Sequence, residues 1–173
     1  MFIRSALFTA LVIFTCSVMA GEKPGLGKAI SMEELAKVDY TVLPNGYGLP
    51  EGSGNAENGA VVYAQNCLAC HGEDGTDGLN DRLVGGLGSL TTDKPVKTVG
   101  SYWPYATTLF DYVRRAMPYQ APGSLTNNQV YAVTAYILFL NGIVEEDAQL
   151  NAQTLPNVKM PNRDNVVWDY QPE

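Results

Sequence analysis

The spacing of apolar positions along the chain, at intervals of three to four residues, predicts a helix over residues 55–66. Within this segment Gly59 and Tyr63 lie four positions apart, so they share one helical face. Asn55 stands at its start, where an asparagine side chain can accept a hydrogen bond from a free amide of the first turn. The pattern therefore indicates a short amphipathic helix with a defined beginning.

A second helix is predicted in the last third of the chain. Thr126–Gln129 has the spacing of a capping box, in which two side chains satisfy free amides at a helix start. Asn141, which is followed by glycine, marks the end of this helix. We expect the two helices to cross, with Tyr136 meeting Gly59 or Tyr63. The apolar positions of the second helix are Val130, Val133, Ile137 and Leu140.

The other segments carry weaker signals. Ser31–Glu34 forms a further capping box, which predicts a short helix, and residues 107–116 have helical spacing. Residues 72–97 are rich in glycine and have no sustained period, so we expect a long loop that packs on a cofactor. Residues 143–173 also lack a helical period. The pattern as a whole predicts a small all-α protein with irregular ends.

These signals divide the chain into four parts. We expect a signal peptide at residues 1–20 and an irregular N-terminal extension at residues 21–54, because residues 43–50 are rich in proline, glycine and asparagine. The helical domain is predicted at residues 55–142. The rest of the chain, residues 143–173, is expected to form a C-terminal tail that wraps this domain.

The first twenty residues have the features of a secretory signal. A positive charge at Arg4 precedes an apolar run from Ala6 to Val18 that is too short to span a bilayer. We expect cleavage after Ala20, which places the mature protein in the periplasm without a stable membrane span. The alternative is a retained N-terminal anchor, which needs a longer apolar stretch followed by cations.

Composition limits the partners. The chain has 173 residues, of which 17% are charged, and its formal net charge is −7. A charged fraction of about 25% is typical of globular domains. The acidic balance argues against nucleic acid, since binding to phosphates needs clustered lysine and arginine. A protein partner with a basic surface is the better expectation.

Three cysteines and one histidine exclude many kinds of site. A structural zinc site commonly needs four cysteine or histidine ligands. A chain with several haems needs one histidine for each. After removal of the signal, only Cys67 and Cys70 remain, directly followed by His71. Exported proteins commonly use cysteines in disulfides, so this spacing suggests another use.

The segment Cys67-Leu68-Ala69-Cys70-His71 has the C-x-x-C-H pattern of a covalent haem c site. Both thiols add across the haem vinyl groups, and the adjacent histidine reaches the iron as the proximal ligand. The rival interpretation is a thioredoxin-like redox pair, which needs a strand before the motif and a helix that begins at it. Here the predicted helix comes before the motif. We therefore predict one covalently attached haem c.

The sixth iron ligand has two candidates. The single histidine excludes a second histidine ligand, which leaves methionine. Met117 follows a predicted helix and precedes another, so its loop can bring a thioether over the second haem face. Met160 lies beyond the last predicted helix and is the alternative. For either residue, packing in the core is the plain structural interpretation.

Several residues near these candidates allow two interpretations. Arg114 and Arg115 are either solvated helix charges or partners of the haem propionates or of a redox protein. Trp103, with Tyr102 and Tyr105, is better explained as core of a haem pocket than as an electron relay, because aromatic side chains contribute large buried areas.

The arrangement of the motifs resembles class I cytochrome c over roughly residues 55–142. More narrowly, four segments resemble the cytochrome subunits of periplasmic sulfite and sulfane dehydrogenases, which are partners of molybdenum enzymes in bacterial sulfur oxidation. Some relatives carry a second haem domain, whereas we expect a single one from these residues. The four segments are Gly46–Pro50, Gly100–Thr108, Arg114–Pro118 and Lys159–Asp164.

The resemblance implies an electron-transfer protein and not an enzyme in itself. It implies a molybdopterin dehydrogenase subunit as electron donor and a downstream cytochrome or oxidase as acceptor. An electron-transfer subunit of another periplasmic dehydrogenase is one alternative. A haem enzyme or gas binder is another, and it would need a displaceable sixth ligand and a distal acid or base.

Overall fold

The computed structural model describes residues 25–167, which belong to two compact units divided after Val38. The predicted signal peptide, residues 1–20, lies outside the described residues. In the first unit, helix α2 (Met32–Ala36) begins at the predicted capping box. The Ser31 hydroxyl accepts a hydrogen bond from the amide of Glu34 at 3.2 Å, and the Glu34 carboxylate accepts one from the amide of Ser31 at 2.8 Å.

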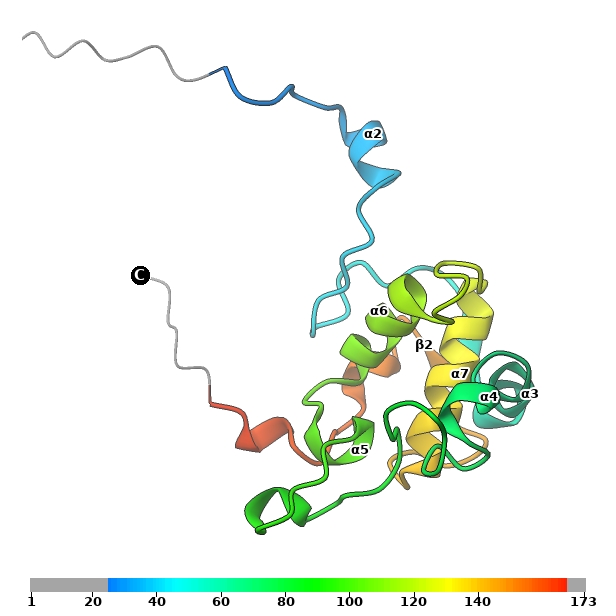
Figure 1. Ribbon diagram of the computed structural model, residues 1–173. Helices are drawn as coiled ribbons and strands as arrows, with labels where there is room; N and C mark the ends of the chain where they lie inside the picture. The colour runs from blue at the N-terminus through cyan, green and yellow to red at the C-terminus, as the bar shows by residue number, and fades with distance from the viewer. Residues whose placement is uncertain (1–24, 168–173) are drawn as a thin grey trace, which may run out of the picture. The chain divides into compact units, whose positions relative to one another are not determined.

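The second unit is built from helices, which confirms the predicted all-α class (Figure 1). Its strand content in the described residues is one pair of two-residue strands. Between residues 25 and 167, no helix has the length and apolar character that crossing a membrane would require. The helices are α3 (Ala56–Asn66), α4 (Leu68–His71), α5 (Val99–Tyr102), α6 (Ala106–Ala116) and α7 (Asn127–Leu140).

Helices α3 and α7 cross as the sequence predicts. Asn55 caps α3 by accepting a hydrogen bond from the amide of Asn58 at 3.1 Å. Gly59 lies against α7 so closely that a Cβ atom there would overlap the main chain of Ala132. One turn later the rings of Tyr63 and Tyr136 pack with centroids 5.3 Å apart. A glycine is therefore needed at the closest approach of the two helices.

Helix α6 packs on another part of α7 and completes the core. The rings of Phe110 and Tyr131 lie 4.4 Å apart between their centroids, and both side chains are fully buried. The hydroxyl of Tyr131 donates to the carbonyl oxygen of Pro50 at 2.9 Å, so the chain before α3 is tied to the same helix. Burial raises the pKa of Tyr131 to about 12.

The chain beyond α7 packs into the core without forming a long helix. Its strand β2 (Leu150–Asn151) pairs antiparallel with β1 (Ser53–Gly54), which directly precedes α3. Leu155 and Met160 are buried, with exposed fractions of 0% and 3%. The regular structure around these residues is limited to short 3₁₀ turns, so a search for helical periodicity does not detect this part of the core. The turns are η2 (Leu155–Asn157) and η3 (Arg163–Asn165).

The long glycine-rich loop after α4 contains a single 3₁₀ turn, η1 (Ser89–Thr91), among the described residues. Helix α5 follows it and was not predicted, because four residues are too few to show a helical period. Thr98 begins α5 by accepting a hydrogen bond from the amide of Ser101 at 3.1 Å. The loop and α5 together cover one side of the space between α4, α6 and α7.

Candidate functional site

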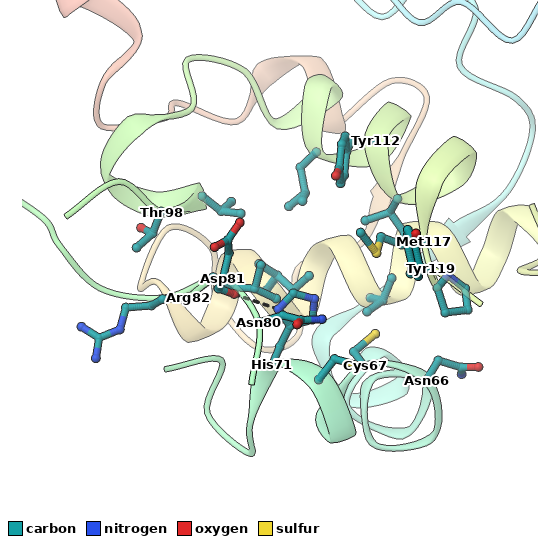
Figure 2. Close-up of a pocket in the computed structure, with 18 of the residues that line it drawn as sticks. Asn66, Cys67, His71, Asn80, Asp81, Arg82, Thr98, Tyr112, Met117 and Tyr119 are labelled. Carbon is teal, nitrogen blue, oxygen red and sulfur yellow. Dashed lines mark hydrogen bonds between the residues drawn. The ribbon is translucent and has the colours of Figure 1, made fainter. Parts of the chain in front are cut away.

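A cavity of about 980 Å³ lies between the C-x-x-C-H segment, α6 and α7 (Figure 2). This volume is near the upper end of the roughly 300–1,000 Å³ that is usual for small-molecule and cofactor sites. Apolar side chains from four segments cover much of its wall. These side chains include Leu83, Val99, Trp103, Leu109, Val113 and Ile137.

The two cysteines of the motif both line this cavity and are free thiols. Cys67 ends α3 and begins α4, so the chain turns at this residue. The amides of Cys70 and His71 donate to its carbonyl oxygen, at 3.1 and 2.9 Å. The motif is therefore one short turn of helix, which is what the spacing predicts. Burial, with a smaller effect from the neighbouring Cys70, raises the pKa of the Cys67 thiol to about 11.

His71 also lines the cavity, and its ring is oriented by the main chain. Its Nδ1 atom lies 2.8 Å from the carbonyl oxygen of Asp81 (Figure 2). A carbonyl oxygen only accepts hydrogen bonds, so Nδ1 must carry the proton in this contact. In the neutral imidazole the other ring nitrogen, Nε2, then keeps its lone pair and can bind a metal.

The segment after the motif folds back over it. The hydroxyl of Tyr63 donates to the carbonyl oxygen of Gly72 at 2.9 Å, and the amide of Asn80 donates to the carbonyl oxygen of Cys70 at 2.8 Å. A Cβ atom at Gly78 would overlap the main chain of His71. Burial raises the pKa of Tyr63 to about 12, so its hydroxyl remains a donor well above neutral pH.

The two candidate methionines lie in different environments. Met117 follows α6 and lines the cavity, and its side chain enters from the α6 side, whereas His71 and Cys67 enter from the α4 side (Figure 2). Met160 is not among the residues that line the cavity, and it is buried in the hydrophobic core. Of the two methionines, Met117 is thus the one that shares a cavity with the motif.

The cations at the cavity are not the two arginines of α6 that the sequence singles out. Arg115 pairs with Asp111, and Arg114 lies over the ring of Tyr40 at 5.2 Å from its centroid. Arg82 and Lys97 line the cavity instead. Both belong to the long loop, where no periodic pattern could have indicated their position.

Among the aromatic residues, Trp103 lines the cavity as expected. Its ring meets that of Tyr112 edge to face, with centroids 5.7 Å apart. Tyr102 and Tyr105 are not cavity residues, contrary to the expectation. Tyr102 is 46% exposed, and the amino group of Lys97 lies over its ring. Helix α5 ends at Tyr102, so Tyr102 and Trp103 have different backbone conformations and their side chains lie in different places.

These residues fit a covalently held haem. Two free thiols, an imidazole with a free Nε2 and a thioether meet in one cavity with a largely apolar wall. Apolar walls suit the faces of a flat macrocycle, and Lys97 could pair with one of its carboxylates, whereas Arg82 already pairs with Asp77 at 3.7 Å. Cys67 and Cys70 would hold the group covalently, and His71 with Met117 would supply the protein ligands to its iron.

Comparison with known proteins agrees with this chemistry. Residues 54–137 match the family model described as cytochrome c oxidase, cbb3-type, subunit III. A chain in the crystal structure of the sulfane dehydrogenase SoxCD from Paracoccus pantotrophus is 44% identical. The match covers 85% of this chain and 73% of that chain, with a TM-score of 0.78.

A curated relative is more distant. It is a thiosulfate dehydrogenase from Psychrobacter arcticus, 27% identical over 101 residues, which is 53% of this chain and 31% of the relative. The chain thus spans about a third of that relative's length. The likeness to the SoxCD chain is closer and covers most of both chains. The protein therefore belongs to the c-type cytochrome family, with an all-α domain of the class I cytochrome c type.

Proposed function

We propose that this protein is a periplasmic cytochrome that holds one haem c and carries single electrons. One observation carries the proposal: Cys67, Cys70, His71 and Met117 all line the same cavity. In this proposal the two cysteines would form the thioether bonds to the haem, and His71 and Met117 would bind its iron. Met160 becomes the alternative ligand only if the tail rearranges.

The residues around the cavity have distinct tasks in this function. When bound, haem c supplies a one-electron iron couple. The Asp81 carbonyl orients the His71 ring through Nδ1, so Nε2 is the nitrogen that would bind the iron. A thioether ligand and an apolar wall both favour the reduced state, which suits an electron acceptor.

Electron transfer fits this cavity better than catalysis or gas binding does. Met117 can fill the position that a substrate or gas would need. A distal acid or base would have to come from another polar side chain, since the one histidine of the chain belongs to the motif. Arg82 and Lys97 line the cavity, but their side chains carry hydrogen-bond donors and no acceptor, so they do not supply a distal base.

The electron donor in this proposal is a molybdopterin dehydrogenase that oxidises sulfite or a sulfane. The likeness to a chain of the sulfane dehydrogenase SoxCD supports this choice. The net charge of −7 favours a donor with a basic docking surface. A downstream cytochrome or oxidase then takes the electron.

Stopped-flow reduction tests the proposal. The oxidised holoprotein is mixed with a sulfite-oxidising molybdoenzyme and sulfite, and haem absorbance is followed. We expect reduction to be faster than with sulfite alone and to slow as salt is raised, because screening weakens the attraction between charged surfaces. Sucrose at matched osmolality is the control and should leave the rate nearly unchanged.

Two outcomes separate the parts of the proposal. Reduction no faster than with sulfite alone, together with rapid reduction by another periplasmic dehydrogenase, would refute the sulfur-oxidising donor and retain the electron carrier. Absence of covalent haem in the purified protein would refute the carrier itself.

A further inference from the structure

Asn141 is a buried asparagine that does not line the haem cavity but joins three segments around it. It is the residue that ends α7, and it is 6% exposed. Its amide nitrogen Nδ2 donates to the carbonyl oxygens of Ile137, at 2.8 Å, and Leu83, at 3.2 Å. Its Oδ1 atom accepts a hydrogen bond from the amide of Gly85 at 3.2 Å.

The third segment is α5. A Cβ atom at Gly100 would overlap the side chain of Asn141, so α5 lies directly against this amide. The same short helix also holds the loop through its own polar groups. The Thr98 hydroxyl donates to the carbonyl oxygen of Gly85 at 2.6 Å, and the amide of Val99 donates to that of Leu83 at 3.3 Å. Asn141 therefore links the loop both to α7 and to α5.

The segment that Asn141 holds is the one that orients the histidine. Leu83 is two residues beyond Asp81, whose carbonyl oxygen accepts the hydrogen bond from His71 Nδ1. On its other side the loop is tied to the motif, since the amide of Asn80 donates to the carbonyl oxygen of Cys70 at 2.8 Å. Asn141 supplies the tie to α7, which contributes Ile137 to the cavity wall.

We propose that Asn141 is a positioning residue that sets the hydrogen bond between His71 and the Asp81 carbonyl, and through it the reduction potential of the haem. The inference rests on the proposed function, because it takes His71 as the iron ligand. A strong bond from Nδ1 to a carbonyl makes the imidazole a better donor to the metal, which stabilises the oxidised state. Loosening the loop weakens that bond and favours the reduced state.

The test compares Asn141→Leu with the wild-type holoprotein. Leucine has a similar volume but none of the three hydrogen bonds. We expect the His71 Nδ1 proton, followed by NMR, to exchange with solvent about tenfold faster, because the loop opens more readily. In a redox titration, the ratio of reduced to oxidised haem at a fixed applied potential should rise by about threefold.

Two further variants make the test specific. Asn162→Leu is the matched control, since Asn162 is also buried, with an exposed fraction of 8%. Its side-chain amide donates to the carbonyl oxygen of Tyr102, the last residue of α5, and not to the loop residues that Asn141 binds. This variant should leave both readouts unchanged. Asn141→Ser is smaller, so it cannot clash with Gly100, and it should move both readouts in the same direction as Asn141→Leu.

Unchanged proton exchange and an unchanged reduced fraction in either Asn141 variant would overturn the inference, as would equal shifts in Asn162→Leu. Neither result would affect the proposed function, which depends on covalent haem in the wild-type protein. Haem staining of that protein on a denaturing gel keeps the two questions separate.

Discussion

The hydroxyl of Tyr63 donates a hydrogen bond of 2.9 Å to the carbonyl oxygen of Gly72. Gly72 directly follows the histidine of the motif, so this contact joins helix α3 to the end of the C-x-x-C-H segment. A single side chain from the turn before the motif thus fixes where the chain leaves it.

Tyr63→Phe should therefore destabilise the holoprotein by about 1 kcal/mol, because one hydrogen bond is lost and a carbonyl oxygen is left without its partner. Denaturant unfolding at neutral pH measures the effect. Tyr136→Phe is the control, because its ring packs on Tyr63 but its hydroxyl forms no hydrogen bond within residues 25–167. Equal losses in the two variants would contradict the assigned contact.

Replacement of both motif cysteines, Cys67→Ser with Cys70→Ser, should abolish covalent haem, and either single change should leave at most one thioether bond. The cavity walls then lack the cofactor that they pack on, so the yield of folded protein should fall. Haem staining on a denaturing gel measures attachment. Ala69→Ser, an exposed change between the two cysteines, should stain like the wild type. Normal staining of the double variant would exclude the haem site.

The two methionines should respond differently to alanine. Met117→Ala removes the thioether from the cavity, so the reduction potential should fall strongly and carbon monoxide should bind the reduced iron. Met160→Ala should cost about 2–5 kcal/mol of stability, as is usual when a buried methionine is truncated, and leave the potential near its wild-type value. If only Met160→Ala opens the iron to carbon monoxide, the ligand assignment must be exchanged.

Alkaline pH should expose the contribution of Tyr131. Its pKa is raised from 10.0 to about 12 by burial. In the unfolded chain the phenol ionises near pH 10, so the stability that its neutral form provides is lost as pH rises from about 10 to about 12.

Tyr131→Phe should be less stable than the wild type by about 1 kcal/mol below pH 10, because the bond to Pro50 is lost. Between about pH 10 and 12 the variant should lose less stability than the wild type, so the two curves converge. Denaturant unfolding across this range gives the curves. Tyr47→Phe, at an exposed position, should follow the wild type.

Local signals predicted the parts of the fold that depend on neighbours in sequence. The capping residues Asn55 and Thr126 correctly predicted where α3 and α7 begin. The four-residue spacing of Gly59 and Tyr63 correctly predicted the face of α3 that packs on α7. Such signals are local because a cap satisfies amides only two or three residues away.

The features that were missed depend on contacts between distant segments. Lys97 lines the cavity, although it belongs to a loop without any helical period. Asn141 was recognised only as a helix end, since its partner Leu83 is brought to it by the fold. Sequence favoured Met117 over Met160 because of its place between two predicted helices, but it left Met160 as an alternative, since burial in the core and exposure to a cavity both favour methionine.

The pairing of β1 with β2 has a consequence for truncation of the chain. It joins the chain just before α3 to a segment far later in the sequence, and the residues that follow β2 deliver Leu155 and Met160 to the core. A chain cut before β2 would keep the C-x-x-C-H motif but would lose the partner of β1 and both of these buried side chains. Residues 150–160 are therefore a part of the folded domain and not a dispensable tail.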